Sequence, residues 1–234
     1  MLFRSSPATA RSRLTAVRRF AAWLAEEGEI DADPLLGITP PKLTETVVDR
    51  LTDEELVALL GACAGKSFVD LRDAALVRFY AETGARAREV LQMAVADVDV
   101  ARGVAVIRYG KGAKQRLVPF GAQTARALDR YQRARRSHRL AADPAFWLGG
   151  GGQRFGYNAA DKALKARAAK ACVDDFHLHR LRHSAATRWL AAGGSEQGLM
   201  SMAGWSTRSM LDRYTKASAS DRAIAESRTL DLGL

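Results

Sequence analysis

Two turns in the sequence carry charged side chains that could meet a bound ligand. Gly84 lets the backbone turn sharply at the end of one helix, and Arg86 then stands in the first turn of the next. Glu89 follows three residues later and could orient that arginine. At the second turn, residues 110–112, Lys111 lies between two glycines, from where its ammonium can reach a ligand held elsewhere. Each turn, taken alone, is also compatible with ordinary charged surface.

Two later segments add phosphate donors and a nucleophile. His179 and Arg182 are three residues apart, so they share one face of a predicted helix and form a compact set of donors for a phosphate. Tyr214 lies between Arg213 and Lys216. A nearby positive field favours the phenolate over the neutral phenol, whose ordinary pKa is about 10. The residues therefore predict anion binding beside a tyrosine of lowered pKa.

Two other patterns suggest nucleotide or metal binding, and their details argue against both. Residues 61–67 resemble a phosphate-binding P-loop, but three residues separate the glycines where the motif needs four. His179 and His183 have a spacing that can bind zinc, but Arg182 shares their face and would repel a cation. Hydrogen-bonding histidines are the better interpretation, and we expect neither a metal nor a cofactor.

Composition narrows the class of protein. The 234 residues are 47% hydrophobic and 26% charged, which is typical of a globular chain with one or two domains. No apolar run approaches the ~18 residues of a membrane span, and the first ten residues lack the apolar run of a secretory signal. Two cysteines, Cys63 and Cys172, are too few for a disulfide framework. We therefore expect a cytoplasmic protein without a membrane partner.

The charge of the chain favours an acidic partner. A net charge of +10, from 36 basic and 26 acidic residues, most often indicates nucleic acid. Residues 101–150 hold 11 of the basic and 2 of the acidic residues. Arginines make up 28 of the basic residues, and their planar fork can hold a phosphate at two points, although a GC-rich genome would also give this ratio.

Hydrophobic periodicity predicts a mainly α fold with one small antiparallel β-sheet. Thr52 and Glu55 form a capping box, Gly84 ends a long helix, and the proline-containing stretch 31–49 reads as a linker. Residues 149–152 read as a flexible glycine loop. The expected strands are 104–109 and 115–119. The expected helices are 9–27, 52–63, 68–83, 86–93, 121–140, 157–171, 179–192, 195–203, 207–216 and 219–228.

Taken in order, the four segments resemble the catalytic motifs of the tyrosine recombinases, the phage integrase and Xer-like family. The resemblance runs from about residue 51 to residue 215. The matching motifs are Thr-Gly-x-Arg-x-x-Glu at 83–89, Gly-Lys-Gly-x-Lys-x-Arg at 110–116, His-x-Leu-Arg-His at 179–183, Ala-Gly-Trp-Ser at 203–206 in place of Leu-Gly-His-Ser, and a tyrosine nine residues after the Trp205 position. Each motif is weak alone, but the ordered set is highly specific.

The resemblance implies an architecture. Residues 51–234 would form the catalytic domain, with the DNA breaking-rejoining fold, and residues 41–50 a linker. Residues 1–40 would be a shortened helical core-binding segment that ends in Asp-Pro-Leu-Leu at 33–36. No arm-binding domain is visible. Both a naturally minimal integrase and a truncated one fit this pattern.

The resemblance also implies catalytic roles. Tyr214 would attack a scissile phosphate and form a 3′-phosphotyrosine. Arg86 and Arg182 would stabilise the non-bridging oxygens, and Lys111 would be the general acid for the leaving 5′-oxygen. His179 would assist proton transfer or phosphate binding.

Supporting roles follow from the same motifs. Trp205 stands where the family usually has histidine; its indole can donate a hydrogen bond but cannot shuttle a proton. Glu89 and His183 would support the arginine network. The basic residues expected to contact DNA are Lys114, Arg116, Arg180 and Arg213.

The expected partners are duplex DNA attachment sites, and a homotetramer on two paired duplexes. Accessory DNA-bending or directionality factors fit the reaction, which would integrate or excise a phage or mobile element. Residues 217–234 could dock on a neighbouring protomer or pack within the chain. Two alternatives stay open: a type IB topoisomerase-like enzyme that relaxes supercoils, and a non-catalytic DNA-binding protein on the same fold.

Overall fold

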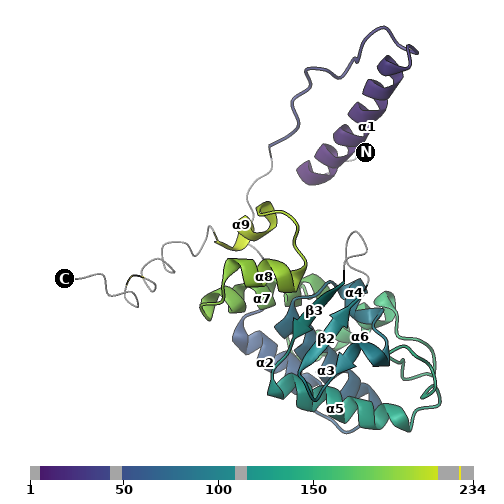
Figure 1. The fold of residues 1–234 in the computed structure, drawn as a ribbon, viewed down its shortest axis with the longest axis vertical. Helices are drawn as coiled ribbons and strands as arrows, with labels where there is room; N and C mark the ends of the chain where they lie inside the picture. Colours follow the sequence, from purple (N-terminus) through teal and green to yellow (C-terminus); the bar gives the residue numbers. More distant parts are fainter. Residues whose placement is uncertain (1–5, 43–48, 109–114, 216–226, 228–234) are drawn as a thin grey trace. The chain divides into compact units, whose positions relative to one another are not determined.

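The computed structural model describes residues 6–42, 49–108, 115–215 and 227 (Figure 1). Packing divides the chain into two units, Met1–Val47 and Val48–Leu234. None of the helices in the described ranges reaches the length and apolarity that crossing a membrane requires. The elements, in order, are α1 (Pro7–Glu26), α2 (Asp53–Ala62), α3 (Phe68–Thr83), α4 (Ala87–Leu91), η1 (Val95–Asp97), β1 (Val98–Asp99), β2 (Val104–Ile107), β3 (Arg116–Pro119), α5 (Ala122–Arg136), α6 (Tyr157–Lys170), α7 (Leu178–Ala191), α8 (Glu196–Ala203) and α9 (Ser209–Thr215).

The first unit is built on α1. Ser6 caps the helix by accepting the Thr9 backbone N–H, and a proline occupies its first turn. The turn after the helix is closed by Asp33, whose carboxylate accepts the Leu35 N–H at 2.9 Å. Arg18 donates to the Leu35 carbonyl at 3.2 Å and so ties this turn back to the helix.

Within this unit the apolar stripe of α1 stays largely exposed. Phe20 is 57% and Trp23 49% exposed, and their rings stack at 5.8 Å. Ala21 is the buried residue of the helix. The helical period predicted the helix, but the sequence alone did not show that the described residues of this unit leave the stripe exposed.

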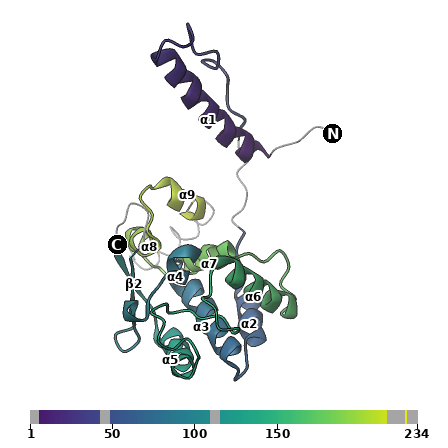
Figure 2. The same cartoon turned by 90° about the vertical axis from the view of Figure 1, so that its right-hand side faces the viewer.

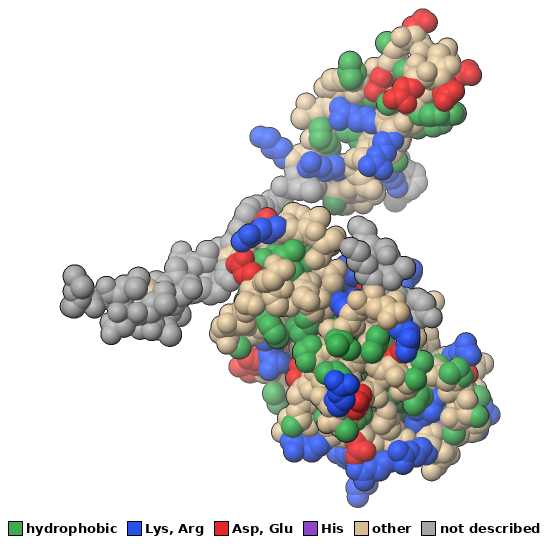
Figure 3. Space-filling model, in the orientation of Figure 1, with side chains coloured by type: hydrophobic (Ala, Val, Ile, Leu, Met, Phe, Trp, Pro, Cys, Tyr) green, Lys and Arg blue, Asp and Glu red, His purple; other side chains and the backbone are tan. Residues whose placement is uncertain are grey.

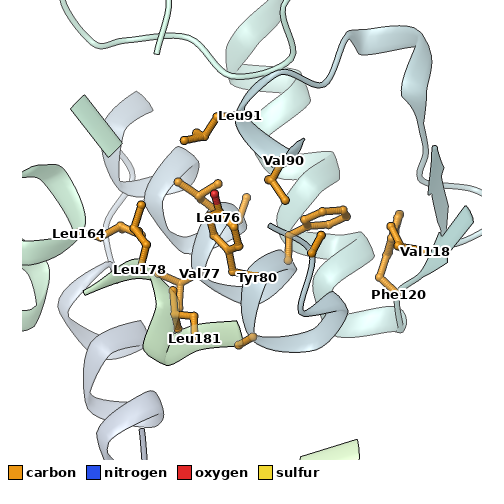
Figure 4. Packing of buried hydrophobic residues seen from close by; sticks show 14 of the residues in the cluster. Leu76, Val77, Tyr80, Val90, Leu91, Val118, Phe120, Leu164, Leu178 and Leu181 are labelled. Carbon is orange, nitrogen blue, oxygen red and sulfur yellow. The ribbon is translucent and has the colours of Figure 1, made fainter. Parts of the chain in front are cut away.

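The second unit is organised around α3, which packs against α5 and α7. Ser67 and Asp70 form a capping box at its start, and Gly84 ends it in the left-handed conformation. Figure 4 shows Leu76, Val77 and Tyr80 of α3 at the centre of the core. The side chains labelled around them come from several other parts of the unit: Val90, Leu91, Val118, Phe120, Leu164, Leu178 and Leu181. Elements far apart in sequence are thereby held against a single helix.

The sheet has three antiparallel strands in the order β1-β2-β3, where the sequence predicted two. In the second hairpin, Ala105 pairs with Val118 and Ile107 with Arg116. Ala105, Ile107 and Val118 are fully buried on one face. The two residues of β1 are too few to show a period of two, which explains why the pattern missed that strand.

Charged residues near the start of α3 form a cluster of ion pairs. Arg72 contacts Asp73 at 2.7 Å. From α6, Arg167 contacts Asp70 at 2.8 Å and Asp73 at 2.9 Å. Two guanidinium groups therefore face two carboxylates, and the charges within this cluster are balanced.

Part of the positive charge lies away from the predicted site. Four arginines of α5 are exposed, namely Arg126, Arg130, Arg133 and Arg136. Figures 1 and 2 place α5 at the opposite end of this unit from α9, and Figure 3 shows Lys and Arg side chains gathered along that lower edge. Only part of the excess of basic residues in the middle of the chain therefore lies near the predicted site.

Candidate active site

The site begins where α3 ends. Gly84 has φ +57°, and a Cβ there would lie 3.2 Å from the Ala185 Cβ on α7. The Thr83 hydroxyl donates to the Phe79 carbonyl at 2.7 Å and stays within the last turn of the helix. A glycine at this position lets α3 stop against α7 and sends the chain into α4 with Arg86 at its start.

Arg86 is held by a carboxylate and by a helix end. Its Nη1 lies 2.9 Å from a Glu89 oxygen, and its Nη2 donates to the Gly204 carbonyl at 3.0 Å. The second Glu89 oxygen accepts from Arg116 Nη2 at 2.6 Å. Burial by itself raises the pKa of the Glu89 carboxyl, but hydrogen bonds from Arg116 and Arg86 outweigh it and hold that pKa below its usual range.

Arg182 is oriented by two backbone carbonyls. It donates to the Gly84 carbonyl at the end of α3, and its Nη2 donates to the Ala203 carbonyl at 3.0 Å. Only 5% of the residue is exposed. Burial, with repulsion from Arg86, lowers the pKa of the Arg182 guanidinium to about 10, so the group stays charged at neutral pH. Carbonyl dipoles direct this cation without neutralising its charge.

Trp205 and Tyr214 stack beside this arginine. Their ring centroids are 5.1 Å apart with planes inclined by 20°, and the Arg182 guanidinium carbon lies 5.4 Å from the indole centroid. Gly204 ends α8 with φ +67°, and the Trp205 N–H returns to the Met200 carbonyl at 2.9 Å. The helix end that supplies carbonyls to both arginines therefore also positions the indole.

Tyr214 is buried, and its hydroxyl contacts His183. It forms a hydrogen bond with His183 Nδ1, and the ring centroids are 5.5 Å apart. Burial raises the pKa of the Tyr214 phenol, while Arg182 and Arg213 act in the opposite direction without overcoming it. The prediction of a lowered pKa is therefore wrong for this state, because desolvation disfavours the phenolate more than the arginines favour it.

The two histidines of α7 are in contact. The His179 and His183 ring centroids are 4.4 Å apart, edge to face, and His179 is exposed. Partial desolvation of the ring and the Arg182 charge lower the pKa of His179, and desolvation together with His179 lowers the pKa of His183 to about 4. Both rings are therefore neutral at physiological pH.

Two residues expected to contact DNA, Arg180 and Arg116, contact other groups of the protein instead. Arg180 is only 6% exposed, and its guanidinium pairs with Asp49 at 2.9 Å and Glu55 at 3.3 Å. It fastens the start of α7 to the segment before α2, so we correct that prediction. Arg116 pairs with Glu89 at 2.6 Å and donates to the Met202 carbonyl at 2.9 Å. It therefore holds Glu89 in position within the site. Arg213 is exposed on α9.

The structure brings together Arg86, Glu89, His179, Arg182, His183, Trp205 and Tyr214. Lys111 and Lys114 lie outside the described residues. The sequence analysis missed the backbone acceptors at Gly84, Ala203 and Gly204. Their only signal was a glycine at the end of each of two helices.

Comparison with known proteins gives the site a context. A model described as the phage integrase family matches residues 49–221. Tyrosine recombinase XerC of Chromobacterium violaceum is 33% identical over 212 residues, which cover 90% of this chain and 70% of that protein. Tyrosine recombinase XerD of Mycobacterium leprae is 33% identical over 221 residues, with the same shares.

Solved structures share the fold. A XerH site-specific recombinase, bound to its palindromic difH substrate after cleavage, matches with a TM-score of 0.78 at 20% identity, over 95% of this chain and 67% of that one. The Tn1549 transposon integrase in complex with circular intermediate DNA matches with a TM-score of 0.72 at 16% identity, over 89% and 75%. The mainly helical architecture with its small antiparallel sheet is therefore confirmed.

Proposed function

This chain belongs to the phage integrase family and is a tyrosine site-specific recombinase, and we propose that Tyr214 is the nucleophile with which it opens a DNA strand. The phenolic oxygen attacks the scissile phosphorus, forms a 3′-phosphotyrosine and releases a 5′-hydroxyl. A 5′-hydroxyl from the partner duplex then reverses the step on a new strand. The covalent bond conserves the energy of the phosphodiester, so the cycle needs no nucleotide.

The observation that carries this proposal is the convergence of Tyr214 and two arginines on one helix end. Arg182 and Arg86 are each held by a carbonyl at the end of α8, and Trp205, next in the chain, stacks on Tyr214. Each guanidinium has five N–H donors, of which those held by protein groups are only a part. The rest are available to the non-bridging oxygens, where charge develops in the transition state.

The other residues complete the proposal. Lys111 protonates the leaving 5′-oxygen, and Glu89 keeps Arg86 and Arg116 in place. His179 is exposed beside the site and donates to the phosphate. Trp205 orients the nucleophile and takes no proton.

The substrate we propose is duplex DNA carrying an attachment site, bound by four protomers on two duplexes. The solved relatives named above were captured on DNA, and strand exchange needs two duplexes held together. We place the reaction in the bacterial cytoplasm, where that DNA is, with integration or excision of a phage or other mobile element as its outcome. Residues 1–40, as a helical core-binding segment, bind the same DNA.

The test is a denaturing capture of DNA from cells that express the chain. Covalent adducts are kept through boiling detergent, the attached DNA is sequenced, and the modified peptide is identified by mass. We expect Tyr214 to be linked to one recurrent sequence, with Tyr214→Phe giving no adduct while it keeps salt-sensitive DNA binding. Tyr157, which is exposed at the start of α6, gives the matched control Tyr157→Phe.

The other outcomes separate the alternatives. Adducts scattered over the genome would indicate a relaxing enzyme of the type IB topoisomerase class. Salt-sensitive DNA binding without an adduct, even on a nicked substrate that traps the intermediate, would indicate a binding protein.

A further inference from the structure

We propose that the outer side of α5 is a second DNA-binding surface, which holds a further segment of duplex DNA by its phosphates and does not read its sequence. The inference rests on duplex DNA as the proposed substrate, and it needs nothing from the nucleophile. Its basic side chains come from α5, from α3 and from the turn that leads into α3. We call them the α5 face, and they are Lys66, Arg78, Arg126, Arg130, Arg133 and Arg136.

The arginines of α5 divide into one that supports the fold and several that do not. Arg135 is buried and donates to two backbone carbonyls of the following segment at 3.1 Å. Arg133 is exposed and pairs with Asp129 one turn away. In the part of the chain that the structure describes, three guanidinium groups of α5 form neither an ion pair nor a hydrogen bond, namely those of Arg126, Arg130 and Arg136. The fold does not account for these three charges.

The spacing of these arginines matches a DNA strand. Arg126, Arg130 and Arg133 follow one another at four and three residues, so they share the outer face of the helix. At a rise of 1.5 Å per residue, about 15 Å of helix separates Arg126 from Arg136. One strand of a duplex presents a phosphate about every 3.4 Å along the axis, which gives four or five phosphates over that length. A duplex lying along α5 would therefore meet its exposed arginines in succession.

A hollow runs beside these arginines, between α5 and the turn into α3. Its two adjoining parts have volumes of about 330 and 460 Å³ and share Lys66, Leu71 and Arg130. Among the described residues, no carboxylate lines either part. The floor is apolar and is made by Leu60, Leu71, Ala74, Ala127 and Ala134. A nucleic-acid backbone alternates sugars with phosphates, so basic side chains around an apolar floor suit both of its components.

The carboxylates nearest to the α5 face leave its charge largely unbalanced. Asp129 is paired with Arg133, and Asp70 belongs to the ion-pair cluster at the start of α3. Glu82 accepts the backbone N–H at the start of α5 at 2.6 Å. A polyanion is therefore the complementary partner. A straight row of cations favours a duplex over an acidic peptide, because a duplex is already rigid and evenly charged, whereas a peptide must first be ordered.

The α5 face lies away from the candidate active site. Figures 1 and 2 place α5 and α9, the helix of Tyr214, at opposite ends of this unit, and Figure 3 shows Lys and Arg side chains along the α5 edge. A duplex whose scissile phosphate meets Tyr214 therefore leaves the α5 face open. One protomer can hold its recombination site at one end and a flanking or neighbouring segment at the other, which raises the local concentration of DNA around the site.

The experiment follows the acetylation of Lys66 in the full-length chain. A duplex of about 12 base pairs and unrelated sequence is added at several salt concentrations, and the modified lysines are identified by mass. We expect saturating duplex to slow acetylation of Lys66 at least fivefold, because phosphates cover the α5 face. The duplex concentration that gives half of this protection should rise steeply with salt.

Two charge-matched variants locate the effect. Arg126→Gln with Arg130→Gln should raise the half-protecting concentration about 50-fold at 0.1 M salt and lower the salt slope by about 2, since two phosphate contacts are lost. Glutamine is a good helix former, so melting temperatures should stay close to that of the unaltered chain. Arg102→Gln with Arg188→Gln removes the same charge from exposed positions outside the α5 face and should leave both quantities within about twofold.

The remaining outcomes decide against the proposal. Protection of Lys66 by a polyglutamate peptide and not by the duplex would assign the α5 face to an acidic protein segment. No protection by either, or an equal response of the two double variants, would make it ordinary charged surface. Tyr214→Phe should protect Lys66 as the unaltered chain does. A chain that protects Lys66 but forms no adduct would therefore remove the proposed nucleophile and keep the second DNA-binding surface.

Discussion

The two ends of α3 (Phe68–Thr83) both meet arginines, but they handle the charge differently. At the start, Arg72 and Arg167 face Asp70 and Asp73 in ion pairs of 2.7 to 2.9 Å. At the end, Arg182 is held by backbone carbonyls instead of a carboxylate. The charges at the start of α3 are balanced. At its end, the Arg182 guanidinium keeps its positive charge in a fixed orientation.

The site as a whole carries an excess of positive charge. Glu89 serves Arg86 and Arg116 together, so these residues and Arg182 set three guanidinium groups against one carboxylate. A buried cation with dipolar partners costs stability, and here the cost coincides with the place where a phosphate would bind. The arginines at the start of α3 are neutralised by carboxylates and stabilise the fold, whereas Arg182 at its end is oriented by carbonyls and keeps its charge for an anion.

The sharpest test of this comparison places the same substitution at both ends. Arg182→Met should lower the rate of adduct formation by about 1,000-fold or more, because a donor to the developing charge is lost. Its free energy of unfolding should change by less than about 1.5 kcal/mol, because the cost of burying a cation is removed together with its two hydrogen bonds. Single-turnover cleavage and urea unfolding measure the two quantities. A large loss of stability would show that Arg182 has a structural role as well.

Arg72→Met should do the reverse. Arg72 is buried and pairs with buried Asp73, so its removal leaves a carboxylate with one partner fewer. Breaking a buried pair costs about 3 kcal/mol, and this loss should appear in urea unfolding. Cleavage by the folded fraction, measured well below the melting temperature, should stay within about threefold. A cleavage defect as large as that of Arg182→Met would erase the distinction between the two ends.

Glu89→Gln tests the one carboxylate of the site. We expect adduct formation to fall about tenfold, because an amide can accept from only one of the two arginines. The folded-state pKa of Glu89 is lowered, so its stabilisation is present at neutral pH and is lost as pH falls below the unfolded value of about 4.3. Glu89→Gln should therefore lose less stability than the wild type between pH 6 and pH 3, as followed by thermal melting. An identical pH dependence would contradict this charge assignment.

The smallest expected effect is at the helix end that supplies the carbonyls. Gly204→Ala should cost about 1 kcal/mol for its left-handed φ of +67°. It should also lower cleavage several-fold, because the new Cβ would lie 2.8 Å from the Arg116 guanidinium carbon. Gly193→Ala is the control, since Gly193 has φ +80° and a Cβ there would have no atom within 4 Å. The melting temperature should fall in both variants, further in Gly204→Ala because of its contact with the Arg116 guanidinium, and only Gly204→Ala should affect cleavage.

Local features of the fold were readable from the sequence. The capping box at Thr52 and Glu55 is present, and α3 begins and ends at the predicted residues, with Gly84 as its left-handed end. Caps, turns and helical periods depend on residues within three or four positions of one another, which a single sequence displays directly. The ordered motifs also sufficed to indicate the family, because each pairs a residue type with a fixed local spacing.

Tertiary structure alone decided the environment of those residues. Arg182 meets Gly84 across 98 positions and Arg180 meets Glu55 across 125, so one arginine faces the site and the other supports the fold. The protonated state of Tyr214 and its contact with His183 likewise follow from burial. Desolvation and partner geometry depend on which distant elements cover a side chain, and no local spacing encodes them.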